Sequence, residues 1–130
     1  MKKVKMFVHE PSINDLLGRE FSLLLNENAH IIDAIDEVDK VIKRKGRFPV
    51  LQYGSLLHMV YNPVENRFYE QVAVSAHKQS GQMLNLRANP TQELPDGITI
   101  VLIPAGGCIS KWEEAIDYMK FLSTMSKAST

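Results

Sequence analysis

The stretch "LPDGITIVLIPAGG", residues Leu94–Gly107, decides the fold that we predict for this chain. Its centre, Ile98–Ile103, is apolar at almost every position, which is typical of a central strand buried on both faces. An acidic-glycine turn precedes this strand, and Pro104 follows it. Gly106 and Gly107 come next. They are either a turn before the following residues or a Gly-Gly end that serves as an attachment point.

The composition indicates an ordinary globular domain and excludes several kinds of site. The sequence has 130 residues, with 15 Lys and Arg against 15 Asp and Glu, so bulk charge does not favour nucleic acid or an anionic membrane as partner. Cys108 is the single cysteine, which excludes an internal disulfide and favours a reducing cytoplasm. No apolar run predicts a membrane span, and the first residues lack the apolar core of a signal peptide.

Two strands are expected near the N-terminus. The stretch "KVKMFV", Lys3–Val8, alternates between apolar and other residues, and Arg19–Leu25 does the same. The residues between them, 9–18, contain proline, asparagine and glycine and indicate a loop. We therefore expect a hairpin whose first strand buries Val4, Met6 and Val8.

The most regular pattern predicts a helix that starts after an Asn28 N-cap and ends at Gly46. Lys43, Arg44 and Lys45 occupy its last turn, where cations suit the helix dipole. "KRKGR", residues 43–47, could also contact phosphate, although a helix end with solvated charges explains it equally simply. The buried stripe is expected to be Ile31, Ala34, Ile35, Val38 and Ile42.

The second half of the chain predicts further strands and one more helix. Residues 55–61 and 66–76 predict a hairpin around "NPVEN", and residues 83–87 a short strand. After Gly107, Ser110 and Glu113 form a capping-box pair. An apolar stripe at helical spacing follows, made of Trp112, Ala115, Ile116, Met119 and Leu122.

This order of elements predicts an α+β protein with a mixed sheet crossed by one helix. Two adjacent N-terminal strands, a helix and a buried last strand describe a β-grasp, the ubiquitin-like fold. We expect residues 1–107 to form this domain, with an inserted hairpin at about 47–68, and residues 108–130 to form a helical extension.

Three stretches carry a resemblance to a known family: "VKMFV" at residues 4–8, "NENAHIIDAIDEV" at 26–38, and "ELPDGITIVLIPAGG" at 93–107. They resemble the MoaD/ThiS family of ubiquitin-like sulfur carriers. MoaD is the small subunit of molybdopterin synthase, and ThiS serves thiamine thiazole synthesis. The chain departs from the family in its inserted hairpin and in the residues that follow Gly107.

The resemblance implies a carrier that is not itself an enzyme and needs no cofactor. In the family, an ATP-dependent, E1-like activating enzyme adenylates the last glycine, which then becomes a thiocarboxylate for a sulfur-accepting synthase. By resemblance Gly107 would carry the sulfur, and Gly106 would be its slim neighbour. Because a peptide bond joins Gly107 to Cys108, this role requires cleavage after Gly107.

Other interpretations stay open at the level of the sequence. The chain could be a β-grasp interaction module in which Gly106-Gly107 is only a turn, or a binder of a small ligand under the last helix. Cys108 is either a reactive thiol or a small buried residue, and the four scattered histidines show no metal-ligand spacing. Any residue of the inserted hairpin left exposed would mark a partner or homodimer surface, the candidates being Leu56, Met59, Tyr61, Phe68 and Tyr69.

Overall fold

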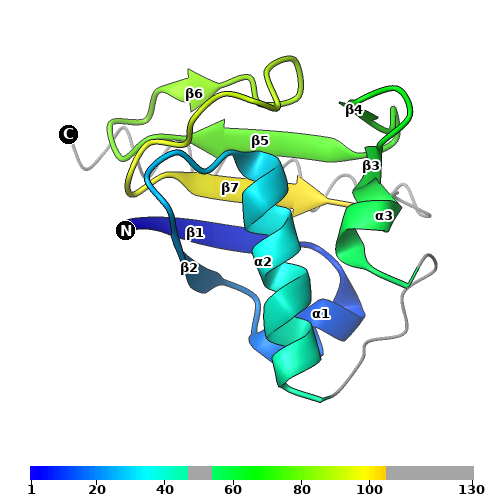
Figure 1. The fold of residues 1–130 in the computed structure, drawn as a ribbon. Helices are drawn as coiled ribbons and strands as arrows, with labels where there is room; N and C mark the ends of the chain where they lie inside the picture. The colour runs from blue at the N-terminus through cyan, green and yellow to red at the C-terminus, as the bar shows by residue number, and fades with distance from the viewer. Residues whose placement is uncertain (47–53, 105–130) are drawn as a thin grey trace.

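The computed structural model describes residues 1–46 and 54–104, which form a sheet with helices against one face (Figure 1). None of the helices in these two ranges is both long enough and apolar enough to cross a membrane. The elements in chain order are β1 (Lys2–Val8), α1 (Pro11–Leu17), β2 (Phe21–Leu25), α2 (Ile31–Arg44), α3 (Leu56–Val60), β3 (Tyr61–Asn62), β4 (Arg67–Phe68), β5 (Ala73–His77), β6 (Met83–Leu84) and β7 (Thr99–Ile103).

The main sheet has the strand order β2-β1-β7-β5-β6. β1 pairs antiparallel with β2 and parallel with β7, and β7 pairs antiparallel with β5. The predicted N-terminal hairpin and the predicted central strand are therefore confirmed. β7 has a partner strand on each side, and Ile100, Val101, Leu102 and Ile103 are all buried, as expected of a strand that is covered on both faces.

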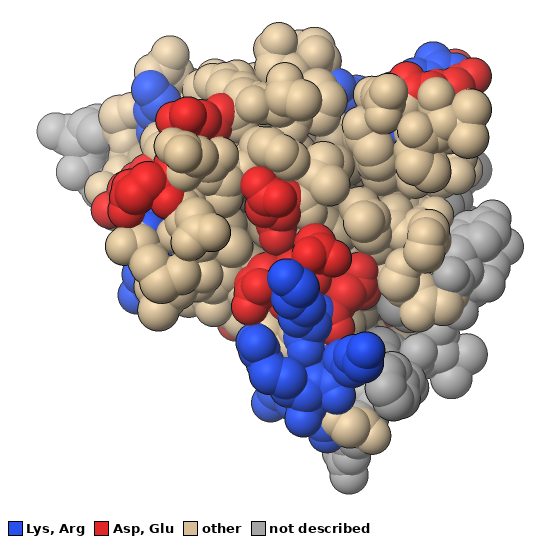
Figure 2. Space-filling view, in the orientation of Figure 1, with Lys and Arg blue, Asp and Glu red and all other residues tan. Residues whose placement is uncertain are grey.

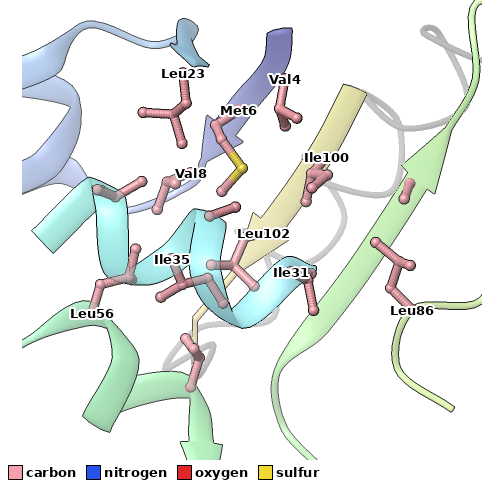
Figure 3. Packing of buried hydrophobic residues seen from close by; sticks show 14 of the residues in the cluster. Val4, Met6, Val8, Leu23, Ile31, Ile35, Leu56, Leu86, Ile100 and Leu102 are labelled. Carbon is pink, nitrogen blue, oxygen red and sulfur yellow. The ribbon is translucent and has the colours of Figure 1, made fainter. Parts of the chain in front are cut away.

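α2 crosses the sheet and supplies the main layer of the core. Its predicted apolar stripe is buried along the whole helix, and Gly46 adopts a φ of +68° just after it, as expected of a C′ glycine. The prediction of Asn28 as N-cap is wrong, because His30 takes that position and its N–H donates to the Asp33 carboxylate at 3.0 Å. Figure 3 shows Met6 and Leu102 of the sheet beside Ile35 of α2.

Residues 9–18 are not a plain loop, since they contain α1. Pro11 lies in the first turn of this helix, where its missing N–H is not needed. The Glu10 carboxylate accepts a hydrogen bond from the Ser12 N–H at 2.8 Å and so caps the helix. Ile13 is fully buried and holds α1 against the core.

The predicted strand at residues 55–61 is also wrong, because Leu56–Val60 form α3. The Ser55 hydroxyl accepts from the His58 N–H at 3.1 Å, and the Asp39 carboxylate of α2 accepts from the N–H groups of Leu56 and Leu57 at 2.9 and 3.1 Å. Two side chains thus satisfy the free N–H groups of the first turn. Asp39 lies 17 residues before Leu56, so no local sequence pattern predicts this cap.

The predicted hairpin around "NPVEN" is real but short. β3 and β4 pair Tyr61 with Phe68 and Asn62 with Arg67 in a separate two-stranded sheet. The expected strand at 66–76 is divided into β4 and β5, because the Arg87 guanidinium donates to the carbonyl oxygens of Tyr69 and Val72 between them. The inserted hairpin and the C-terminal extension, as domain boundaries, stay predictions, since residues 47–53 and 105–130 lie outside the described ranges.

Candidate functional site

The C-terminal end of β7 leads toward the two glycines. The His9 N–H donates to the Leu102 carbonyl oxygen at 2.9 Å, and Pro104 is buried just beyond the strand. Proline cannot donate to a strand ladder, so regular pairing ends there. In Figure 1 the β7 arrow points to the side of the sheet where α3 lies. Gly106, Gly107 and Cys108 lie outside the described residues.

The face of the sheet opposite α2, which we call the second face, has an apolar half next to this strand end. Phe7 pairs with Val101, and Val101 with Ser75, so these residues form one row across three strands. Phe7 and Val101 are 3% and 1% exposed, and Ile103 is 1% exposed. We call this cluster, made of Phe7, Ala73, Val101 and Ile103, the apolar patch.

The other half of the second face is basic. Lys5 pairs with Thr99, and Thr99 with His77, so they form the neighbouring row. A cavity of about 350 Å³ opens here. We call it the basic groove, and its lining residues are Lys3, Lys5, His77, Lys78, Gln79, Gly97 and Thr99.

Two features shape the basic groove. Burial lowers the pKa of His77 below its ordinary value, because charging a buried imidazole removes it from water. Gly97 has a φ of +77°, and a Cβ there would lie 2.9 Å from the Gln79 side-chain nitrogen, so the turn requires glycine. Lys5 is paired with Glu20 at 3.0 Å across the rim.

The structure changes the expected partner surface. Leu56, Met59 and Phe68 belong to the core and are not exposed, because α3 turns the first two inward and β4 does the same for the third. Tyr61 and Tyr69 are half-buried against the same core, and the Tyr61 ring meets that of Phe68 edge-on with centroids 5.3 Å apart. Of the five, only Tyr61 and Tyr69 are partly exposed, so the expectation of a partner surface is limited to these two.

The outer side of α2 carries charge of both signs. Figure 2 shows acidic side chains over the middle of the helix and basic ones at its end. Asp36 and Lys40 approach to 3.3 Å, as do Glu37 and Arg44. Such exposed pairs are typical of a solvated helix face. No group of three or more metal-ligating side chains is found within residues 1–46 and 54–104.

The sequence did not single out the two halves of the second face. A partial signal was present, since Phe7 shares its side of β1 with Lys3 and Lys5. The row partners on β7 and β5 are distant in the sequence, so only the strand order joins them.

Comparison with known proteins bears on the fold. No protein-family model matches the chain, and no curated protein matches it. Among solved structures, it is similar to the small archaeal modifier protein 1 of Haloferax volcanii, with a TM-score of 0.51 and 13% identity over 82% of this chain and 100% of that one. The chain has the β-grasp fold.

A second similar structure comes from Pyrococcus furiosus and is described as molybdopterin converting factor, subunit 1. It has a TM-score of 0.47 and 20% identity, over 82% of this chain and 100% of that one. The ubiquitin-like fold expected from the order of elements is confirmed. Since the whole of the modifier protein aligns with 82% of this chain, the present chain has residues beyond the shared fold.

Proposed function

We propose that this chain is a sulfur carrier of the MoaD/ThiS type, whose working end is Gly107 after cleavage of the Gly107–Cys108 bond. One observation carries the proposal. In a β-grasp fold shared with a small archaeal modifier protein, the central strand β7 ends at the buried Pro104 and leads directly into Ala105-Gly106-Gly107.

The chemistry that the resemblance implies needs a free carboxylate on Gly107. One carboxylate oxygen attacks the α-phosphorus of ATP, pyrophosphate leaves, and Gly107 becomes an acyl adenylate. A sulfide nucleophile then attacks the acyl carbon and AMP leaves, so that a thiocarboxylate remains on Gly107. The E1-like activating enzyme supplies the acids and bases, and a synthase later accepts the sulfur. We infer a reducing cytoplasm as the setting of this work, because the chain has a single cysteine.

The geometry of β7 suits a carrier that must present a short tail. β1 and β5 hold the strand by backbone pairing on both sides, so its end is a rigid platform. The three residues after Pro104, 105–107, could reach at most ~11 Å beyond it. An activating enzyme must therefore approach the strand end closely, and two glycines without Cβ atoms would let a narrow active site enclose the backbone.

Intact-mass analysis of the protein from its native cells tests the proposal. We expect a species ending at Gly107, part of it heavier by the mass difference between sulfur and oxygen. Gly107→Ala should abolish the heavier species, whereas Ala105→Ser, a small change in the same segment, should retain it. Recovery of full-length chains alone, from cells in which the protein functions, would overturn the carrier role.

A second candidate function is a β-grasp interaction module in which Gly106-Gly107 is only a turn. The basic groove favours it, because its lysines can recognise an acidic partner by charge complementarity. This function predicts that full-length chains occur in a native complex and that Gly107→Ala leaves the complex intact. Loss of the complex in Gly107→Ala would contradict it.

A further inference from the structure

The basic groove on the second face has a floor made of paired backbone. The Gly97 N–H donates to the Lys3 carbonyl oxygen at 2.8 Å, which joins the turn before β7 to β1. The Gln79 side chain lies over Gly97, so close that a Cβ on Gly97 would be 2.9 Å from the Gln79 side-chain nitrogen. The fold therefore holds the shape of the cavity, and its volume of about 350 Å³ is typical of a site for a small ligand.

The walls of the groove carry positive charge that the lining itself does not neutralise. The lining residues include three lysines and no Asp or Glu. Lys5 is paired with Glu20, and the Asp96 carboxylate accepts from the backbone N–H of Lys3 at 2.7 Å. The ammonium groups of Lys3 and Lys78, however, make no ion pair with any residue in the part of the chain that the structure describes. Two uncompensated ammonium groups at one cavity favour an anionic occupant.

A buried imidazole is a second and independent indication of a ligand. His77 is 6% exposed and lines the groove, yet its ring makes no hydrogen bond with any described residue. Buried polar groups in native proteins have a partner, so this ring calls for one inside the cavity. Burial lowers the pKa of His77, so the ring is neutral at physiological pH and one of its nitrogens can donate. Thr99 and Gln79 add a hydroxyl and an amide to the same lining.

We propose that the basic groove is the binding site of a phosphate-bearing small molecule, held by the ammonium groups of Lys3 and Lys78 and by the Thr99 hydroxyl. A phosphate group offers three strong acceptor oxygens, which suits a cavity that combines ammonium groups with neutral donors. Lys3 belongs to β1 and Lys78 directly follows β5, with β7 between them. Strands two positions apart are about 10 Å from each other, so two linked phosphates would reach both ammonium groups better than one.

The groove is separate from the strand end on which the proposed carrier role depends. Thr99 is the first residue of β7 and Ile103 the last, and the four steps between them cover about 13 Å. The glycines follow the far end of this strand. The inference therefore goes beyond the carrier role and does not rest on it.

Titration of the isotope-labelled full-length protein with pyrophosphate, followed by NMR at constant ionic strength, tests the inference. We expect saturable shifts of the amide signals from the groove. Lys3→Gln and Lys78→Gln should each weaken binding roughly two- to fivefold, and Thr99→Val should weaken it without a change of charge. Lys40→Gln removes the same charge from the exposed side of α2 and should leave the affinity as in the wild type.

Several outcomes would overturn the inference. Shifts that do not saturate at constant ionic strength, or an equal loss in Lys40→Gln, would mean that the protein only attracts counter-ions. Unchanged affinity in both groove lysine variants, with thermal melts that show them folded, would exclude the groove. Tighter binding of a polyglutamate peptide than of pyrophosphate would assign the groove to an acidic protein partner. Gly107→Ala should bind pyrophosphate as the wild type does, so this test and the mass analysis fail separately.

Discussion

The two faces of the central sheet differ in what covers them, although β7 contributes to both equally. Ile100 and Leu102 point into the large core with α2, while Val101 and Ile103 belong to the apolar patch of the second face. The first face is closed by elements within the described fold, and it holds most of the buried apolar side chains. The second face combines a small patch with lysines. The contrast indicates that the α2 face holds most of the apolar core, whereas the second face adds a small buried cluster and a basic groove.

Adjacent residues of β7 allow the sharpest test of this contrast. Ile100→Ala should lower the free energy of unfolding by about 2–5 kcal/mol, because it leaves a cavity in the α2 core. Val101→Ala removes two methyl groups from the small buried cluster of the second face and should lower it by roughly 2 kcal/mol. Urea unfolding measures both. Equal losses for the two variants would break the comparison.

A smaller effect is expected where α2 holds α3. Asp39→Ala removes the acceptor of the Leu56 and Leu57 N–H groups and should cost about 1–2 kcal/mol. Asp36→Ala is the matched control, since the pair of Asp36 with Lys40 is exposed and its loss should change stability by about 0.5 kcal/mol or less. Urea unfolding at one pH compares them. If Asp36→Ala lowers the free energy of unfolding as much as Asp39→Ala does, the lost cap of α3 is not the cause of the destabilisation.

Asp39 also has a pH dependence of known sign. Burial raises the pKa of this carboxyl above its ordinary value, while the Leu56 and Leu57 N–H groups oppose that shift. The native state therefore binds more protons than the unfolded chain between the ordinary and the raised pKa. The stability that this group contributes is complete below that window and decreases as pH rises through it.

On the second face the sign is reversed, and the effect is smaller. Because burial lowers the pKa of His77, the unfolded chain binds more protons just below the ordinary histidine pKa, and stability falls as pH drops through that ordinary pKa of about 6.5. His77→Gln should reduce this loss in thermal melts on both sides of that pH. Thr99→Ser changes the same groove and should retain the wild-type dependence of the melting temperature on pH. Lys3, Lys5 and Lys78 also line this groove, and both variants leave them in place. If the melting temperature of His77→Gln depends on pH as in the wild type, His77 does not cause the loss of stability.

The smallest effect is predicted at the rim of the groove. Lys5→Gln breaks the pair with Glu20, in which both side chains are about half exposed. Exposed pairs of this kind contribute about 0–1 kcal/mol, so the free energy of unfolding should hardly change. Thermal melts at low and high salt check this. A loss similar to that of Val101→Ala would mean that the charged half of the second face also supports the fold.

Elements with a strong period were predictable, and elements held by distant side chains were not. α2 and β7 carry long, consistent patterns, so their type followed directly from the residues. The residues of α3 predict a strand, because "SLLHMVY" is rich in strand-forming residues, while the helix depends on a carboxylate of α2. The same helix buries Leu56 and Met59, which removed them from the expected partner surface.

The sequence by itself determined the N-terminal strand pair, the core side of α2, and the position of the two glycines after a buried strand. These depend on periodicity and turn chemistry, which act over a few residues. The tertiary structure alone decided that Lys5, Thr99 and His77 form one row and that Phe7 and Val101 form the next. The physical reason is that sheet neighbours are set by strand order and register, which join residues far apart in the chain.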